Sequence, residues 1–146
     1  MCIRDRHNML ILNVKEDGLE DRLISIMEQY NIKNYFFLDQ SFPSLIKLVE
    51  GGEKRCSVRV SEFEAIDTAL FLTGKVEWIW VDCFKKMPLT RENANTLKGA
   101  GFKLCFVSPE LHLKVDKKYV QNFKNNIMTQ GITVDAVCTK YLDVWE

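Results

Sequence analysis

Trp78-Ile-Trp-Val-Asp82 is a run of four apolar residues that ends at a carboxylate, and helix-like sequence follows it after a loop. Strands buried on both faces of a parallel sheet are continuous apolar runs, whereas strands with one face in water alternate apolar and polar residues. The stretch is therefore typical of one parallel β/α unit, in which a helix follows a strand and leads the chain to the next one.

Five further runs have the same form, so the chain is expected to contain six parallel β/α units. They lie at residues 10–15, 35–39, 56–62, 104–110 and 136–139. Helices are expected at residues 19–30, 41–50, 64–71, 90–99 and 116–129, from apolar spacing and capping residues. The carboxyl ends of parallel strands open onto one face, which is where such folds carry out their chemistry.

Six units in an α/β fold allow two architectures. One is a partial (β/α)8 TIM barrel without its first two units, since complete barrels usually have about 250 residues and this chain has 146. The other is an open, doubly wound parallel sheet, although no glycine-rich phosphate loop follows the first strand. In either case we expect one domain at residues 8–146.

Residues 1–7 are expected to be a non-native leader. One back-translation of Met1-Cys-Ile-Arg-Asp-Arg6 resembles the transposase end sequence that is used to prepare sequencing libraries. The alternative is a natural polar tail, because irregular termini are common.

Composition excludes some partners. The 20 basic and 20 acidic side chains give no net charge, so there is no basic field to attract nucleic acid. No run approaches the roughly 18 apolar residues of a transmembrane segment, and no signal peptide follows the charged start. The five cysteines lack C-x-x-C spacing and are expected to be small hydrophobes in a reducing compartment, the cytoplasm. A structural zinc site is the alternative.

Polar side chains at the strand ends are the candidate site. Asn13 and Lys15 share one face of their strand. An inward lysine needs an anion such as a phosphoryl oxygen, unless its ammonium extends into water. Asp39 and Asp82 each end a strongly apolar strand, either in a shared site or as helix caps.

Two other segments add candidate residues. Arg59 suits a phosphate or a carboxylate, and the alternative is a structural ion pair with Glu62 or Asp39. Ser108-Pro-Glu110-Leu-His112 carries a carboxylate and an imidazole two residues apart, which could form an acid/base pair or a ligand pair. The alternative for His112 is a solvated loop histidine.

Several of these segments, in this order and spacing, resemble the glycerophosphodiester phosphodiesterase-like branch of the phospholipase-C-like phosphodiesterase barrels. They are Leu12-Asn-Val-Lys15, Tyr35-Phe-Phe-Leu-Asp39, Val60-Ser-Glu62-Phe-Glu64, Trp80-Val-Asp82 and Val107-Ser-Pro-Glu-Leu-His112, and Cys138-Thr139 looks like the last strand. The resemblance covers nearly everything from Leu10 onward. It implies an eight-stranded barrel that hydrolyses phosphodiesters, usually with a divalent cation such as Ca²⁺ or Mg²⁺.

The resemblance also implies roles for individual residues. Lys15 would be catalytic, in contact with the phosphoryl group. In the same interpretation the substrate is bound by Asp39, Arg59, Glu62, Asp82, Glu110 and His112. Asn13 stands where many members have a glutamate metal ligand, and a neutral amide holds a hard cation less well.

The family's defining His-Arg pair, the acidic ligands beyond it and its second histidine are not in this chain. We therefore expect an inactive fragment of a phosphoric diester hydrolase that holds no cation by itself. The alternative is a noncatalytic binding module for a phosphorylated or polyol ligand. Open barrel edges on the first and last strands would favour self-association.

Overall fold

The computed structural model of the chain describes residues 9–146, so the leader expected at residues 1–7 lies outside the described residues. The protein has an α/β fold in which parallel strands alternate with helices. The strands are β1 (Leu10–Asn13), β2 (Tyr35–Leu38), β3 (Ser57–Val60), β4 (Trp78–Val81), β5 (Lys103–Val107) and β6 (Ala136–Cys138). The helices are α1 (Glu20–Gln29), α2 (Phe42–Glu50), α3 (Ile66–Leu70), α4 (Arg91–Gly99), α5 (Lys117–Thr129) and α6 (Leu142–Trp145), and a 3₁₀ helix, η1, spans Pro109–Leu111.

The strands lie in chain order and every ladder is parallel, but they form two sheets rather than one. β1 pairs with β2, and a second sheet has the order β3-β4-β5-β6. A single bridge between Phe37 and Cys56 connects the two sheets. The six expected strands and five expected helices are confirmed, whereas η1, α6 and the break between β2 and β3 were not expected.

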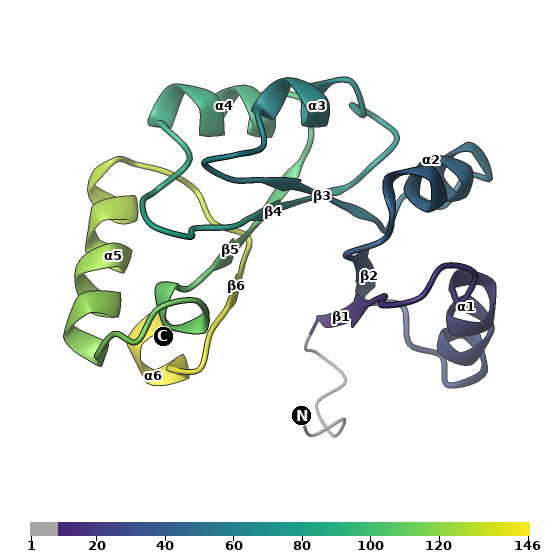
Figure 1. Cartoon of the computed structure of the whole chain (residues 1–146), viewed down its shortest axis with the longest axis horizontal. Helices are drawn as coiled ribbons and strands as arrows, with labels where there is room; N and C mark the ends of the chain where they lie inside the picture. The colour runs from purple at the N-terminus through teal and green to yellow at the C-terminus, as the bar shows by residue number, and fades with distance from the viewer. Residues whose placement is uncertain (1–8) are drawn as a thin grey trace.

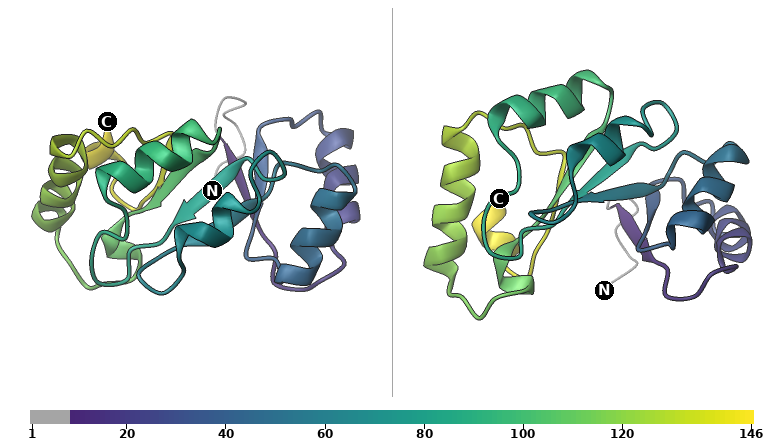
Figure 2. Two further views of the ribbon diagram at one scale, coloured as in Figure 1. Left: turned by 90° about the horizontal axis from the view of Figure 1, so that it is seen from above. Right: turned by 45° about the horizontal axis from the view of Figure 1, so that its top comes forward.

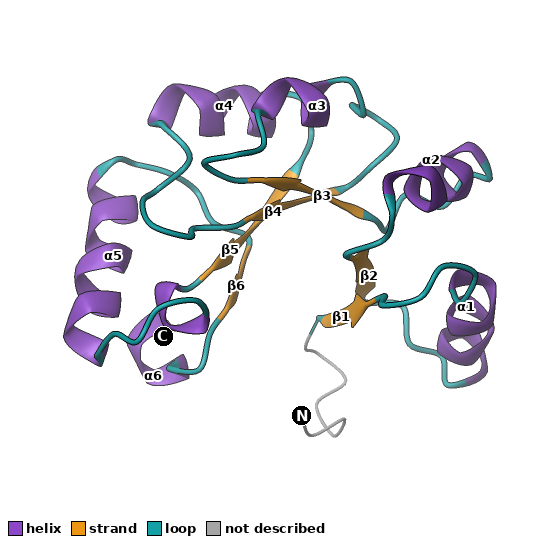
Figure 3. Cartoon of the chain, viewed as in Figure 1, coloured by secondary structure: helices purple, strands orange, loops and turns teal. Residues whose placement is uncertain are grey.

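The strands form a curved arc, and α1 to α5 lie along its convex side (Figures 1 and 3). Figure 2 shows from two further directions that α1 and α2 cover the β1–β2 pair, while α3, α4 and α5 cover the larger sheet. The helices α1 to α5 therefore all lie on the outer side of the strands, as expected for consecutive right-handed β/α units.

Both faces of the arc are apolar, which explains the continuous apolar runs in the sequence. The convex face packs against the helices through Phe37, Val58, Val60, Ile79, Val81, Leu104 and Phe106. The concave face holds a second cluster of Phe36, Leu38, Trp78, Trp80, Cys105 and Val107. The Phe36 and Trp78 rings stack with their centroids 4.8 Å apart, and Trp78 and Trp80 are both packing residues of this cluster.

Among the described residues, no helix combines the length and the apolar character that crossing a membrane would require.

Candidate functional site

Five charged or titratable side chains form a continuous row along the carboxyl ends of the strands, and we call them the charged row. Lys15 Nζ lies 2.9 Å from Asp39 Oδ2, and the other carboxylate oxygen of Asp39 accepts a hydrogen bond from Arg59. Arg59 Nε lies 3.5 Å from Asp82 Oδ2, and the second oxygen of Asp82 bonds His112 Nε2. Each member follows or belongs to a different strand, from β1 to β5 in order.

Strand register directs the middle of the row to the concave face. Arg59 is paired with Trp80 across β3 and β4, and Trp80 belongs to the concave cluster. Side chains two apart on a strand share a face, so Asp82 continues the line of Trp80. Arg59 thus faces away from Val58 and Val60, since both valines pack on the convex side.

Asp39 reaches the row only because its backbone leaves the strand conformation. Alternation would direct its side chain to the convex face, together with Phe37. Its φ of +61° lies in the left-handed region, which aspartate tolerates better than most residues. The chain therefore turns at the end of β2, and the Asp39 carboxylate reaches Lys15 and Arg59.

The environment of Asp39 favours its ionised form. Partial burial alone would raise the pKa of this carboxyl. The hydrogen bond from Lys15 and the positive charge of Arg59 outweigh burial and hold the pKa below its ordinary value. Asp39 is therefore an anionic link between two cations.

Asp82 and His112 form a carboxylate–imidazole dyad. The Asp82 side chain is only 4% exposed, and its partner ring is packed against Phe84 with centroids 4.8 Å apart. Because a carboxylate only accepts, His112 Nε2 is the donor in this bond. An oriented imidazole of this kind can take or give a proton. The sequence offered either a pair with Glu110 or a solvated loop position for His112, and in the structure its partner is Asp82.

Glu62 stabilises the loop after β4 and is not a member of the charged row. Its carboxylate accepts hydrogen bonds from the backbone N–H groups of Phe84, Lys85 and Lys86 at 3.2, 2.6 and 2.7 Å. Burial works in the opposite direction, but these bonds lower the pKa of Glu62 to about 2. Glu62 thus holds the loop that carries Phe84 against His112.

Glu110 also has a structural role, because its carboxylate is buried and hydrogen-bonded to the fold around it. It is 6% exposed and accepts from Ser108 Oγ and Thr139 Oγ1, both at 2.5 Å, and from the Lys140 backbone N–H at 2.8 Å. Burial would raise the pKa of Glu110, but the two hydroxyl bonds outweigh it and lower the pKa. The expected substrate-binding role for Glu110 therefore has no free oxygen to support it, and the residue ties β5 to the segment after β6.

The residues around Asn13 do not fit a calcium or magnesium site. Asn13 offers one neutral oxygen, and the nearby carboxylates of Asp39 and Asp82 are already paired with cationic or imidazole groups. Within residues 9–146 no group of three His, Cys, Asp or Glu side chains is arranged to hold a metal ion.

Two adjoining cavities flank the row. The mouth cavity has a volume of about 280 Å³ and is lined by Asn13, Leu38, Asp39, Arg59, Trp80, Asp82, Phe84, Val107, Leu111 and His112. The second is larger and lies between β2 and β3. Asp39, Arg59 and Leu38 line both cavities, so the Asp39–Arg59 pair forms the wall between them.

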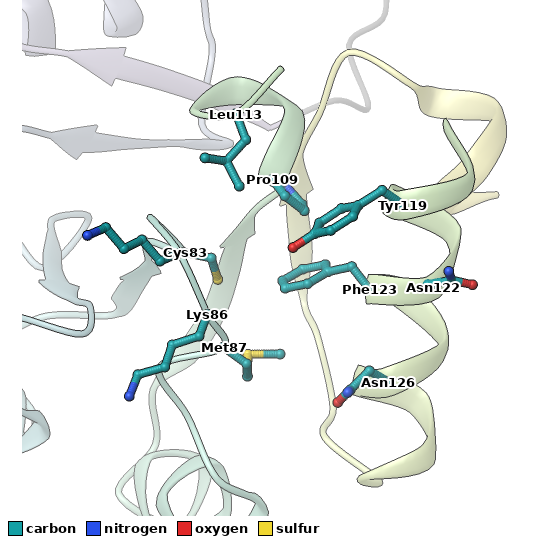
Figure 4. Close-up of a pocket in the computed structure, with 10 residues that line it drawn as sticks. Cys83, Lys86, Met87, Pro109, Leu113, Tyr119, Asn122, Phe123 and Asn126 are labelled. Atoms are coloured by element: carbon teal, nitrogen blue, oxygen red, sulfur yellow. The ribbon is translucent and has the colours of Figure 1, made fainter. Parts of the chain in front are cut away.

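A third hollow of about 350 Å³ lies away from the row, between α5 and the loop after β4 (Figure 4). Figure 4 shows the Tyr119 and Phe123 rings facing Cys83 and Met87 across it, while the Lys86 ammonium points away. None of the site residues expected from the sequence lines this hollow.

Sequence reasoning missed Phe63, Phe84 and Gln40, which line the two cavities beside the row. Phe63 and Phe84 approach each other with ring centroids 6.1 Å apart. Phe63 lies between two glutamates in a loop at the end of a strand, and an aromatic residue in that setting could have marked an exposed ring.

Comparison of the chain with protein-family models, curated proteins and solved structures finds no match in any of the three.

Proposed function

We propose that the chain is a fragment of a phosphoric diester hydrolase of the glycerophosphodiester phosphodiesterase-like kind, and that the charged row holds the phosphoryl group of its substrate. The observation that carries the proposal is the row itself, to which five successive β/α units each contribute one member. Asp39, Arg59, Asp82 and His112 line the mouth cavity, and Lys15 lines the adjoining cavity between β2 and β3. Lys15 and Arg59 are the cationic members, and both residue types recognise phosphate oxygens.

A partial barrel is the form of the α/β fold that this proposal requires. Its support is the strand order, in which strands that are consecutive in the chain are neighbours within each sheet, together with helices along one side of the arc. An open, doubly wound sheet instead reverses its strand order at a switch point and has helices on both faces.

Catalysis by this chain alone is not expected. The Asp82–His112 dyad can move one proton. Hydrolysis of a phosphodiester needs in-line attack and departure, with charge stabilised on both sides of the phosphorus. The family's His-Arg pair would supply the other side, and the sequence does not contain it.

A noncatalytic binding module for a phosphorylated or polyol ligand is the second candidate, and Asn13 favours it. Asn13 lines the mouth cavity, where the related enzymes have a carboxylate that binds a cation. The coding sequence upstream of Met1 separates the two candidates, since a His-Arg strand would support the enzyme.

The phosphate-binding part is tested by NMR titration of the purified chain with inorganic phosphate and glycerol 3-phosphate. Lys15→Ala should weaken both ligands by about five- to tenfold, because it removes one charge-assisted contact. Lys33→Ala is the control, since Lys33 is exposed at the opposite, amino end of β2. Equal binding by the wild type and Lys15→Ala would contradict the proposal.

Turnover is tested with glycerophosphocholine and the same two variants. Both variants are expected to hydrolyse glycerophosphocholine no faster than buffer without protein. A clear hydrolytic rate that disappears in Lys15→Ala would overturn the proposal that the chain is inactive alone.

We also propose that the protein works in the cytoplasm. Cys56, Cys83 and Cys105 are buried free thiols, and burial raises the pKa of each one. Such thiols are inert packing groups and need no oxidising compartment. Recovery of the protein outside the cytoplasmic fraction of its source cells would contradict this.

A further inference from the structure

The break between β2 and β3 opens a cavity beside the charged row, which we call the sheet split. Phe37 N donates to Arg55 O at 2.8 Å, and the Ser57 hydroxyl, at 2.8 Å, donates to the Phe37 carbonyl where a backbone N–H would normally bond. Beyond Phe37, no backbone hydrogen bond joins the two strands in the described part of the chain. The strands diverge there, and the resulting cavity has a volume of about 690 Å³.

The walls of the sheet split are polar and electrically balanced. Its charged lining comprises Lys15 and Arg59 against Asp39 and Glu64. Gln40 and Thr68 add uncharged polar groups. A purely apolar ligand would leave these groups desolvated without partners, and a polyanion would face two carboxylates. The lining therefore suits an uncharged group with many hydroxyls.

Gln40 supplies an independent sign of a missing partner. Its side-chain Nε2 lies 3.4 Å from Glu20 Oε1, and because a carboxylate only accepts, this fixes the orientation of the amide. The opposite atom, Oε1, is buried and accepts no hydrogen bond. A buried acceptor without a donor costs free energy, so a ligand hydroxyl at this point would be stabilised.

Two exposed aromatic rings line the same cavity. The Phe42 side chain is 52% exposed and the Phe63 side chain 75% exposed, although both are large and apolar. Free aromatic faces next to hydroxyl-binding groups suit a ligand that has a flat C–H face as well as hydroxyls. A pyranose ring has both features, whereas a glycerol chain has no such face.

We propose that the sheet split is a subsite for a sugar ring that belongs to the phosphorylated ligand held by the charged row. This inference rests on the proposed function, and the two cavities meet at the Asp39–Arg59 pair. A ligand bound beside this pair places its phosphoryl group by Lys15 and Arg59 and its ring by Phe63 and Gln40, and these four residues all line the sheet split.

The test is NMR titration with glucose 1-phosphate, glycerol 3-phosphate, inorganic phosphate and methyl glucoside, which carries no phosphate. Glucose 1-phosphate should bind about three- to tenfold more tightly than the other two phosphates, as expected for one aromatic contact. Phe63→Ala should remove this advantage and leave inorganic phosphate unchanged. Phe71→Ala is the matched control, because Phe71 is 85% exposed and does not line the cavity.

The outcomes separate the two proposals. If glucose 1-phosphate binds no better than glycerol 3-phosphate, or if Phe63→Ala has no effect, the sugar subsite is wrong while phosphate binding stands. If binding of the phosphates does not depend on Lys15, the proposed function fails. In that case methyl glucoside tests the sheet split by itself. The subsite is wrong if methyl glucoside does not bind, or if Phe63→Ala binds it as tightly as the wild type does.

Discussion

Asp82 is the residue that joins the two halves of the charged row, because its buried carboxylate contacts both Arg59 and His112. It is 3% exposed and lies between a guanidinium and an imidazole. Removal of one partner from a buried pair leaves the remaining charge without compensation, which usually costs several kcal/mol. Exposed pairs are worth much less, because water and salt screen them.

We therefore predict that Asp82→Asn lowers the free energy of unfolding by about 3 kcal/mol. The matched control is Glu77→Gln, which affects a pair with Lys103 whose side chains are 39% and 50% exposed. This control should cost less than about 1 kcal/mol. Urea denaturation of the two variants measures the difference, and equal losses would show that Asp82 is not the centre of the row.

The low pKa of Glu62 predicts a pH-dependent contribution to stability. Its folded-state pKa of about 2 lies below the ordinary value of 4.5. Stability from this residue is therefore complete above the unfolded-state pKa and is lost as the pH falls through the folded-state pKa.

The corresponding variant is Glu62→Gln, which should be less stable than the wild type at pH 7. The difference should shrink as the pH is lowered from about 5 to about 2, because the wild-type carboxylate becomes protonated. Glu50→Gln, at an exposed position that ends α2, should show no such trend. A difference that stays constant over this pH range would contradict the assignment of the low pKa to Glu62.

At the scale of secondary-structure elements, α2 is fixed at its start by one hydroxyl. Ser41 Oγ accepts from the Ser44 N–H at 3.3 Å and donates to Asp17 Oδ2 at 2.8 Å. The bond to Asp17 joins the helix to the loop after β1. This loop follows Lys15 directly, so the cap also positions the charged row.

Ser41→Ala should therefore destabilise the protein by about 1 kcal/mol, the usual cost of an N-cap. Amide exchange should increase in the first turn of α2 before it increases elsewhere. Ser44→Ala is the control, since alanine favours the helix and the Ser44 hydroxyl caps nothing. If amide exchange in the first turn of α2 is unchanged in Ser41→Ala, the Ser41 hydroxyl does not stabilise the start of the helix.

The strands could be predicted from sequence because burial on both faces leaves a strong local pattern, as in Trp78–Val81. The pairing of Glu110 with His112 was wrong because local spacing does not give direction. A 3₁₀ helix has three residues per turn, so side chains two apart point to different sides. Glu110 thus faces Thr139 of the next unit, while His112 turns to Asp82.

The break between β2 and β3 could not be predicted, since strand pairing depends on neighbours that are distant in sequence. The Ser57 hydroxyl donates a hydrogen bond to the Phe37 carbonyl, but nothing in the sequence distinguishes Ser57 from other serines in strands. The positive φ of Asp39 is equally hidden, although it decides which face receives the carboxylate. The members of the charged row could therefore be named from the sequence, but their contacts and the aromatic residues beside them could not.

At the scale of the whole molecule, the arc has two free edges. In the part of the chain that the structure describes, β1 pairs only with β2, and β6 pairs only with β5. Leu10 N and Val14 N donate to the β2 side. Ile11 and Asn13 alternate with these residues and direct their N–H groups to the other edge, where they can pair with another chain.

We therefore predict self-association that grows with concentration, measured by sedimentation velocity. Ile11→Pro removes one outward N–H without removing a bond to β2, so it should shift the distribution toward monomer. Leu12→Pro is the contrasting variant, since the neighbouring position faces β2 and its loss should destabilise the fold instead. A wild-type chain that stays monomeric at high concentration would show that these edges are protected, and an Ile11→Pro variant that associates as strongly as the wild type would place the contact elsewhere on the molecule.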